Sequence, residues 1–303
     1  MDQFPKVIII ILNYNRPLDT VDCINSLQQI DYPSFHILLI DNCSTDNSLE
    51  VFSKKLSGVE IYNTEENLGY TRGVNFGLKI AEKFESEYIL LLNNDTIVEK
   101  DFLTILVSAV DSDNSTAAAC GTILCEHRRN EIWYAGGKLI RWRGLAVHNG
   151  KKRLFDRQSD KKPVYTSFIT GCSILLRAKY LEDIGYEDDR FFMYLDDIEL
   201  SSRIQSKGYK LLYVPNSIIY HKVINESESP FKLYYSVRNR LLLISLISKG
   251  FNRIIASSYF LIVISFKLAM WKVSKPSFFK AALFGLEDYF KKFFFKGRGF
   301  EQF

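Results

Sequence analysis

The chain has 303 residues, a formal net charge of +4 at pH 7, 47% hydrophobic residues and 24% charged residues. These fractions are typical of globular proteins and exclude a disordered or collagen-like chain. The length favours one extended α/β domain that carries an appendage. The five cysteines include no Cys-x-x-Cys pair, so neither a disulfide framework nor a structural zinc site is expected, and a reducing compartment fits better. The first residues show no signal-peptide pattern.

Basic residues are unevenly distributed along the chain. Residues 230–303 contain 13 Lys and Arg against 3 Asp and Glu, and they hold 13 of the 23 Phe. The preceding residues contain 26 basic and 32 acidic side chains. Such an abrupt change predicts a boundary near residue 225 between two regions with different surroundings.

Strands and helices are predicted to alternate in the first hundred residues. Continuous apolar runs predict strands that are buried on both faces, and apolar residues at helical spacing predict helices between them. The predicted strands are 7–12, 36–40, 59–62 and 88–92. One predicted helix starts at Pro17, and two others cover 47–56 and 74–81. This order predicts a doubly wound, mostly parallel sheet, which binds ligands at the carboxyl ends of its strands.

No glycine-rich phosphate loop follows the first predicted strand. Residues 13–16 read Asn-Tyr-Asn-Arg, which matches neither the GxGxxG of dinucleotide-binding proteins nor a P-loop. A dehydrogenase or a P-loop NTPase is therefore disfavoured. After the second strand, Asp41 could accept a hydrogen bond from a nucleotide base, or Asp41, Ser44 and Asp46 could cap a turn and the following helix.

The fourth predicted strand delivers Asn93, Asn94 and Asp95 to the same edge of the sheet. One carboxylate with amide oxygens suits Mg²⁺ or Mn²⁺, because such ions use few protein carboxylates and take further ligands from substrate phosphates. The alternative is that Asp95 or Thr96 caps a helix over 100–110.

An acidic pair and a histidine are notable in the second half of the chain. Asp196 and Asp197 begin a predicted helix after several aromatic residues, where one could be a general base or both could favour the helix dipole. Glu199 and Arg203 are spaced as an ordinary surface ion pair. His221 ends a further predicted strand, where it could bind an ion or be structural.

Seven segments, in order along roughly three quarters of the chain, resemble family 2 glycosyltransferases, most nearly the rhamnosyltransferase-like branch. They are NYN, DNCSTD, ENLGYTRGVNFGL, YILLLNND, TGCSILLRA, FFMYLDDIELSSR and LLYVPNSIIYH. The resemblance implies a GT-A fold and a metal-dependent inverting transfer from a nucleoside-diphosphate sugar, with Mg²⁺ or Mn²⁺ as cofactor.

The same resemblance assigns roles to individual residues. Asp95, in a triplet that departs from D-x-D by its first Asn, becomes the main metal ligand, with His221 as the second. Asp197 becomes the catalytic base, and the acceptor site is expected at Asp196, Gly171 and Cys172. The nucleotide-sugar site is expected at Asn13, Tyr14, Asn15, Asp41 at the base, Asn67, Gly69, Asn75, Asn93, Asn94, Asp95 and, at the diphosphate, Arg238.

These expectations give a domain plan and a function. Residues 1–225 would form the catalytic domain, with a nucleotide-binding half at 1–110 and an acceptor half at 111–225, followed by a helical extension at 226–303. The expected reaction moves a sugar, rhamnose by analogy with the branch, to a glycan or lipid-linked acceptor in cell-surface polysaccharide synthesis. Nucleic acid is not an expected partner, because the basic tail is apolar and carries no such motif.

Two other functions are considered. A sugar-phosphate nucleotidyltransferase also uses a nucleotide and Mg²⁺, but it would want a glycine-rich basic loop near the first strand. A non-catalytic sugar-nucleotide-binding or assembly protein would not need both Asp95 and Asp197, and both are present.

The basic, Phe-rich extension predicts peripheral binding to the cytoplasmic face of the cell membrane. Its second apolar run, 254–271, is 18 residues long and includes Lys267, so it is shorter than the ~20 residues of a spanning helix. Aromatic residues among Lys and Arg suit an interfacial helix on anionic lipid. The alternatives are a helical cover packed on the catalytic domain, a homodimer contact and a transmembrane hairpin.

Overall fold

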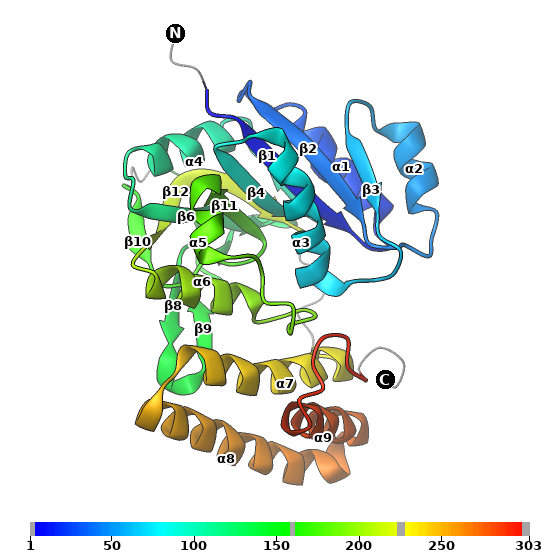
Figure 1. The fold of residues 1–303 in the computed structure, drawn as a ribbon, viewed down its shortest axis with the longest axis vertical. Coiled ribbons are helices and arrows are strands. Elements are labelled where there is room, and N and C mark those ends of the chain that lie inside the picture. The colour runs from blue at the N-terminus through cyan, green and yellow to red at the C-terminus, as the bar shows by residue number, and fades with distance from the viewer. Residues whose placement is uncertain (1–3, 158–160, 223–227, 299–303) are drawn as a thin grey trace.

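The computed structural model describes residues 4–157, 161–222 and 228–298. A large β-sheet with helices on its faces lies above a layer of three C-terminal helices (Figure 1). The predicted boundary near residue 225 falls within 223–227, outside the described residues.

The first half of the chain forms the parallel part of the sheet. Its strands are β1 (Val7–Asn13), β2 (Phe35–Asp41), β3 (Glu60–Asn63) and β4 (Tyr88–Asn93), and its α-helices are α1 (Pro17–Leu27), α2 (Ser48–Lys55) and α3 (Gly69–Ala81). β1 pairs in parallel with β2 and β4, and β3 extends the sheet beyond β2. The predicted alternation is confirmed, and the carboxyl ends of these strands meet at one edge.

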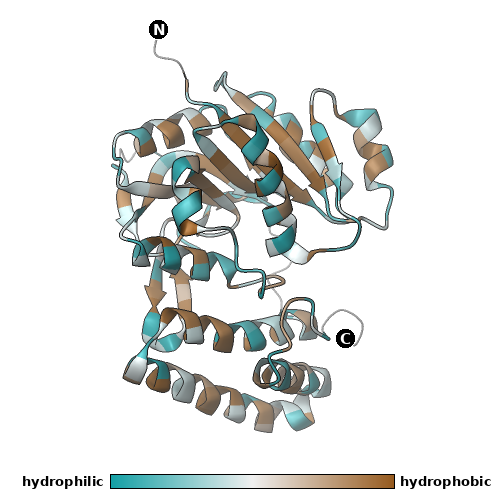
Figure 2. Ribbon diagram, in the orientation of Figure 1, coloured by the Kyte–Doolittle hydropathy of each residue, from teal (hydrophilic) through white to brown (hydrophobic). Residues whose placement is uncertain are grey.

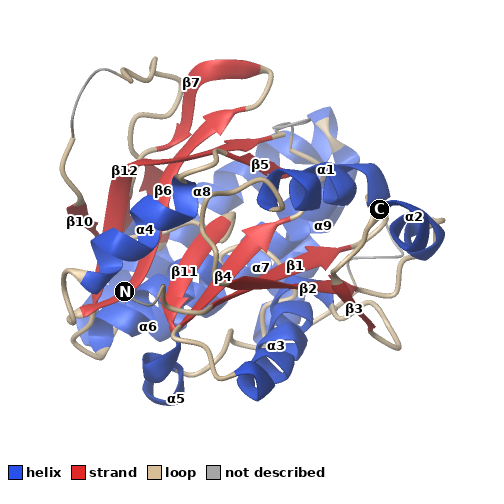
Figure 3. Cartoon of the chain, turned by 90° about the horizontal axis from the view of Figure 1, so that it is seen from above, coloured by secondary structure: helices blue, strands red, loops and turns tan. Residues whose placement is uncertain are grey.

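Small residues let α3 lie close to the sheet. A Cβ at Gly73 would be 2.7 Å from Leu12, and one at Gly77 would be 2.7 Å from Ile10. The strand residues beneath are almost fully buried, as continuous apolar runs predict. In Figure 3, α3 and α6 lie on one side of the sheet and α1 and α4 on the other.

The second half of the chain makes the sheet mixed. It contains β5 (Thr96–Val98), α4 (Phe102–Asp111), β6 (Thr116–Cys125), β7 (Arg128–Tyr134), β8 (Gly137–Ile140), β9 (Leu145–His148), β10 (Val164–Thr166), β11 (Ser173–Arg177), α5 (Leu181–Ile184), α6 (Asp196–Ser206) and β12 (Lys210–His221). β11 runs antiparallel between β4 and β6, whereas β12 is parallel to β6. The predicted parallel arrangement therefore applies to the first half, and the antiparallel insertion of β11 makes the rest mixed.

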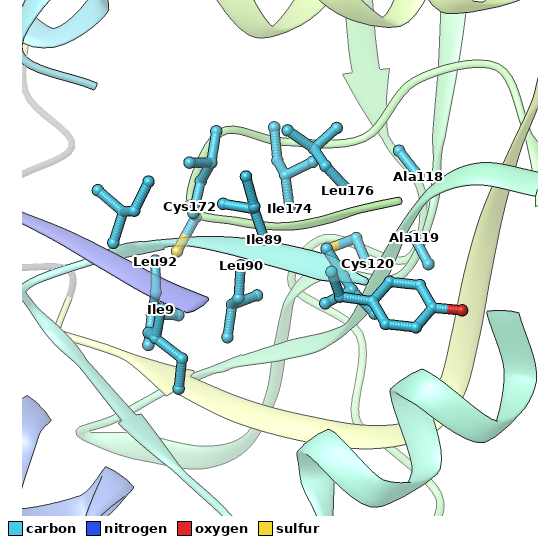
Figure 4. Packing of buried hydrophobic residues seen from close by; sticks show 14 of the residues in the cluster. Ile9, Ile89, Leu90, Leu92, Ala118, Ala119, Cys120, Cys172, Ile174 and Leu176 are labelled. Carbon is cyan, nitrogen blue, oxygen red and sulfur yellow. The ribbon is translucent and has the colours of Figure 1, made fainter. Parts of the chain in front are cut away.

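The core continues across this junction without a break. Figure 4 shows Ile89 of β4 near Ile174 and Leu176 of β11 on one side of the sheet, and Leu90 of β4 near Ile9 of β1 on the other. Burying apolar surface contributes about 25 cal/mol per Å². The continuous core holds the carboxyl ends of β1, β2 and β4 in one rigid frame with the start of β11.

The C-terminal extension consists of α7 (Pro230–Ile247), α8 (Gly250–Ser274) and α9 (Pro276–Phe290). α7 packs on the part of the chain that carries the large sheet: Tyr234 and Tyr235 form one cluster with Phe192, and Arg240 donates to the carbonyl of Arg143 (2.7 Å). The packed-cover alternative is therefore correct for α7.

α8 is longer than its sequence pattern predicts. It has 25 residues rather than 18, so the expectation that it is too short to span a membrane is wrong. In the described parts of the chain it is the one helix long and apolar enough to cross a membrane, and 22% of its most apolar stretch is buried. The helix is extended because neither Arg253 nor Lys272 interrupts its backbone, since both have good helix propensity.

Candidate active site

A buried polar network lies where β1 and β2 end. The Asn13 side chain, 0% exposed, donates to Asp41 (2.7 Å) and Ser44 (3.0 Å) and accepts from Thr20 (2.8 Å) and Asn94 (3.3 Å). Asp41 also accepts from the backbone N–H and the hydroxyl of Ser44. The turn-capping interpretation of Asp41 is thus confirmed, while its contact with a base stays a prediction.

The loop after β1 is tied to the loop after β2. Asn15 has a positive φ of 54°, which Asn tolerates better than most residues. Its side-chain oxygen accepts from the backbone N–H of Thr45 (2.7 Å). Tyr14, between Asn13 and Asn15, is half-buried at the same strand end.

The loop before α3 has its own hydrogen bonds. Asn67 accepts from the N–H of Gly69 (2.9 Å) and from Asn42 (3.2 Å), which also donates to the Gly69 carbonyl. Gly69 has φ +67° and would collide with Phe192 if it carried a Cβ. The Asn75 side chain instead donates to the backbone carbonyl of Glu187 and accepts from the backbone N–H of Glu187 (2.9 Å each). Asn75 therefore connects this helix to the acceptor half rather than to the network at β1.

The two predicted metal ligands are adjacent. Asp95 Oδ1 lies 3.2 Å from His221 Nε2, because β12 pairs antiparallel with β5 and sets His221 opposite Thr96. Asp95 Oδ1 and His221 Nδ1 are both buried, and His221 Nδ1 has no hydrogen-bond partner among the described residues. Burial opposes the charge of Asp95, but His221 and Arg16 outweigh it and lower its pKa.

This donor set fits a divalent cation that takes its remaining ligands from phosphates. The described residues contain no cluster of three or more His, Cys, Asp or Glu side chains around one point. Asn93 and Asn94 precede Asp95, and the Asn94 amide donates to Thr20 (2.9 Å). The helix-cap alternative is wrong, because β5 intervenes and the N-cap of α4 is Asp101.

The acidic pair begins α6, as predicted. The backbone N–H of Gly171 donates to Asp197 Oδ2 (3.0 Å), and Tyr70 donates to the carbonyl of Gly171 (2.9 Å). Burial raises the pKa of both aspartates. The pKa of Asp196 is raised further by the charge of Asp197, whereas the N–H groups of Gly171 and Ile198 favour the charged form of Asp197. Asp196 is therefore the better proton holder and Asp197 the better base.

Glu187 is a third buried carboxyl group that sequence reasoning missed. It is 6% exposed, and burial followed by the charges of Asp196 and Asp197 raises its pKa. Glu199 and Arg203 were expected on the surface, but Glu199 is 7% exposed. Arg203 binds it twice and also donates to the carbonyl of Ile184 (2.6 Å). The Glu199–Arg203 pair is partly buried because α6 packs against the sheet, and Arg203 connects α6 to the end of α5.

The loop before Asp196 is strained and held by the extension. Tyr194 and Leu195 have φ values of 67° and 69°, which costs non-glycine residues of order 1 kcal/mol or more each. Asn239 of α7, 0% exposed, donates to the carbonyls of Met193 (2.8 Å) and Tyr194 (3.0 Å). Asn239 thus fixes the backbone that precedes the acidic pair.

Arg238 does not reach the site where a diphosphate contact was expected. Its side chain is fully buried and donates to Asn239 (3.0 Å) and to the carbonyl of Phe295 (2.6 Å). Its guanidinium also lies 4.9 Å from the ring of Tyr235. In this structure Arg238 supports Asn239 instead.

A cavity of about 480 Å³ joins the acidic pair to the metal-ligand end of the sheet. Its lining includes Asn93, Gly171, Cys172, Asp196, Asp197 and His221. Cys172 is buried, which raises its pKa well above the usual range, so it is unsuited to act as a thiolate. The structure thus brings together residues from four separate strand or helix ends.

The cavity also has lining residues to which the sequence assigned no role, although Tyr70 and Tyr194 lie within two of the seven segments. They are Tyr70, Trp133, His148, Tyr194, Lys232 and Ser236. Lys232 and Ser236 belong to α7, so the extension completes one wall of the cavity. The one sequence signal for Lys232 and Ser236 is their spacing of four residues, because residues i and i+4 lie on one face of a helix.

The family model of glycosyl transferase family 2 matches residues 8–185, more than half of the chain. The chain belongs to glycosyl transferase family 2. The match covers the network at β1, the Asn93–Asp95 triplet and Gly171, while Asp197 and His221 lie beyond it. The predicted family is confirmed, and the rhamnosyltransferase-like branch stays a prediction.

The curated relatives are longer than this chain. The poly-beta-1,6-N-acetyl-D-glucosamine synthase of Staphylococcus epidermidis is 24% identical over 218 residues, which is 71% of this chain and 50% of the relative. The synthase of Staphylococcus aureus strain COL is also 24% identical, over 71% of this chain and 49% of its own length. The chain spans about half the length of the curated relatives it matches.

Solved structures show a GT-A fold. GalNAc-T7 with UDP, GalNAc and Mn²⁺ has a TM-score of 0.63 at 21% identity, over 78% of this chain and 48% of that one. The mannosyltransferase PcManGT of Pyrobaculum calidifontis, with GDP-Man and Mn²⁺, has a TM-score of 0.58 at 14% identity over 96% and 88%. Residues 1–349 of Staphylococcus aureus TarS give 0.57 at 16% identity over 94% and 80%.

Proposed function

We propose that this family 2 protein is an inverting glycosyltransferase that moves a sugar from a nucleoside-diphosphate sugar to a hydroxyl of a glycan or lipid-linked acceptor in polysaccharide synthesis. The observation that carries the proposal is that Asp197 and His221, from different elements, line one cavity. Rhamnose is the first donor sugar to test.

Asp197 is the base in this proposal. A hydroxyl acceptor becomes a better nucleophile when a carboxylate takes its proton during attack. Asp197 is held by the Gly171 N–H at 3.0 Å, and Gly171 is itself held by Tyr70. The raised pKa of Asp197 makes it a stronger base than an ordinary aspartate while it is still ionised near neutral pH.

The donor would lie along the ends of β1, β2 and β4. Asp41, Asn13 and the loop of Asn67 and Gly69 would contact the nucleoside, and Asp95 and His221 would hold Mg²⁺ or Mn²⁺. The bound cation would supply positive charge that stabilises the departing diphosphate. Two of the structural neighbours contain Mn²⁺ with a nucleotide or nucleotide sugar, which supports this cofactor.

A donor panel tests the reaction. The full chain with Mn²⁺ or Mg²⁺ should slowly release nucleoside diphosphate from one donor, with dTDP-rhamnose, UDP-GlcNAc and GDP-mannose as the first three. EDTA should abolish the release. Formation of pyrophosphate instead would support a nucleotidyltransferase, and donor binding without turnover on any acceptor would support a binding protein.

The outer face of α8 is proposed to lie on the anionic cytoplasmic membrane surface. Its exposed apolar residues are Phe251, Ile254, Ile255, Ile262, Phe266, Met270 and Val273, with exposed fractions from 40% to 87%. Figure 2 shows hydrophobic stretches along this outermost helix. Exposed apolar surface beside Arg253, Lys267 and Lys272 suits the boundary of an anionic bilayer.

Vesicle flotation tests this association. Phe266→Asp should weaken binding to anionic vesicles roughly tenfold or more, since burying one Phe contributes about 1.5–3 kcal/mol. Leu154→Asp, at an 80% exposed position of the catalytic domain, is the matched control. High salt should also weaken binding. Binding that resists salt and needs detergent for release would indicate a spanning α8, and a dimer that buries this face without vesicles would replace the proposal.

A further inference from the structure

A second cavity, here called the basic cavity, lies between the β8–β9 hairpin and the junction of α7 and α8. Its volume is about 720 Å³, and its lining includes Lys138, Arg141, Trp142, Arg143, Lys249 and Asn252. Of the described residues that line it, four are basic and none is acidic. In Figure 1 the hairpin extends from the sheet towards the end of α7 where α8 begins.

The hairpin is firmly seated on the extension. A Cβ at Gly144 would collide with Ile244 of α7, so the turn touches the helix directly. Arg141 donates to the carbonyl of Ile247 (3.1 Å) and to Ser202 of α6 (3.1 Å). The contact of Gly144 and the hydrogen bonds of Arg141 therefore hold the hairpin against α6 and α7, while Lys138 and Lys249 reach the basic cavity from its exposed rim.

Positive charge in the basic cavity is incompletely compensated. The Nε of Arg143 is buried and has no hydrogen-bond partner in the described parts of the chain. α8 begins at Gly250, between the lining residues Lys249 and Asn252, and no side chain caps its N-terminus. The first N–H groups of a helix and its dipole favour an anion. A rigid cavity with free donors and no acid is suited to a phosphate group.

The surroundings indicate where this phosphate comes from. Trp142, 53% exposed, packs edge-on against Tyr259 of α8 at 5.1 Å between ring centroids. Aromatic residues of this kind favour the membrane–water interface. The exposed apolar residues Phe251 and Ile255 belong to the same end of α8. The basic cavity thus opens beside the surface that the proposed function assigns to the bilayer.

We propose that the basic cavity binds a phosphate group carried by a lipid, either a phospholipid headgroup or the phosphate of a lipid-linked acceptor. The lipid as the source of the phosphate rests on the membrane association in the proposed function, while the anion site itself does not. β8 lines the basic cavity with Lys138, Leu139 and Ile140, and it pairs with β9, whose Ala146 and His148 line the cavity that contains Asp197. The β8–β9 hairpin therefore contributes one strand to each cavity.

The test uses two double variants of the full chain with the same charge change. Lys138→Glu/Lys249→Glu alters the basic cavity, and Lys267→Glu/Lys272→Glu alters the distant part of α8; all four side chains are exposed. Binding of soluble pyrophosphate is measured by calorimetry in EDTA, which removes cation-dependent binding at the donor site. Binding to vesicles is measured with phosphatidic acid and with oleate at equal surface charge.

Wild type should bind pyrophosphate in EDTA, and the cavity variant should bind at least about tenfold more weakly, while the α8 variant is unchanged. Preference for phosphatidic acid over oleate should be lost only in the cavity variant. If pyrophosphate binds but no vesicle does, the anion site stands and the membrane proposal fails. Equal losses in both variants, or no pyrophosphate binding to wild type, would overturn the basic cavity as a phosphate site. Unchanged binding of UDP with Mn²⁺ checks that each variant is folded.

Discussion

The donor side and the acceptor side of the candidate site use polar residues in opposite ways. At the ends of β1 and β2, the Asn13 amide and the Asp41 carboxylate satisfy each other and the hydroxyls of Thr20 and Ser44. At the start of α6, Asp196, Asp197 and Glu187 are buried near one another, and burial raises the pKa of all three.

This difference separates rigidity from reactivity. A fully paired network of neutral and charged groups orders the chain, and removing one member leaves the others unsatisfied. Buried carboxyl groups with few basic side chains beside them instead have raised pKa values, so they can take up and release protons closer to neutral pH. The donor side should therefore respond to substitution mainly through stability and binding, and the acceptor side mainly through turnover.

The largest effect is expected for Asp197→Asn. The change keeps the size of the side chain and removes the base, so turnover should fall by roughly two to four orders of magnitude with donor binding nearly intact. Steady-state rates and donor titration measure the two effects. Asp183→Asn, on the exposed surface, is the matched control. Near-normal turnover would assign the base elsewhere, with Asp196 as the next candidate.

Loss of the metal ligands should come second. Asp95→Ala should weaken cation-dependent binding of nucleoside diphosphate by at least about 10–100-fold, the range seen when even an outer partner of a metal is lost. His221→Ala should have a milder effect of the same kind. Titration with Mn²⁺ measures it. Activity that is unchanged by EDTA would show that neither Asp95 nor His221 binds a cation that the reaction requires.

The pH dependence of turnover should show whether the ionisation of Asp197 controls the rate. A raised pKa means that Asp197 takes up a proton at a higher pH than an ordinary aspartate, whose pKa is about 3.9. Turnover should therefore decline about tenfold per pH unit as the pH falls below the raised pKa, while donor binding declines less. Burial raises this pKa, and the backbone N–H groups of Gly171 and Ile198 limit the rise. A turnover profile that stays flat down to about pH 4 would argue against Asp197.

The smallest change in rate is expected for Asn13→Ala, whose effect should be on stability. Removing the amide deletes one buried hydrogen bond to Asp41 and one from Thr20, which should lower the free energy of unfolding by about 1–3 kcal/mol. Urea unfolding measures the change. Asn130→Ala, at an exposed position of β7, is the control and should differ little. A larger loss of turnover than of stability would show that Asn13 belongs with the reacting groups.

Much of the first half could be predicted from the sequence, because its information is local. Continuous apolar runs gave β1, β2 and β4 within one or two residues, and the polar residues after them do meet at one edge. The acidic pair at the start of α6 was predicted for the same reason. Glu187 was missed because nothing in its own surroundings reveals that Asn75 and α6 bury it.

The sequence by itself determined the alternation of strands and helices, the polar strand ends, the family and the basic, Phe-rich extension. Only the tertiary structure decided the antiparallel β11, the contact of His221 with Asp95, the burial of Arg238 and the wall that α7 adds to the cavity. The reason is that apolar periodicity indicates whether a segment is buried, but it does not identify the element that packs against that segment. The two long helices α7 and α8 are both apolar, yet one is covered by the catalytic domain and the other presents its outer face to its surroundings.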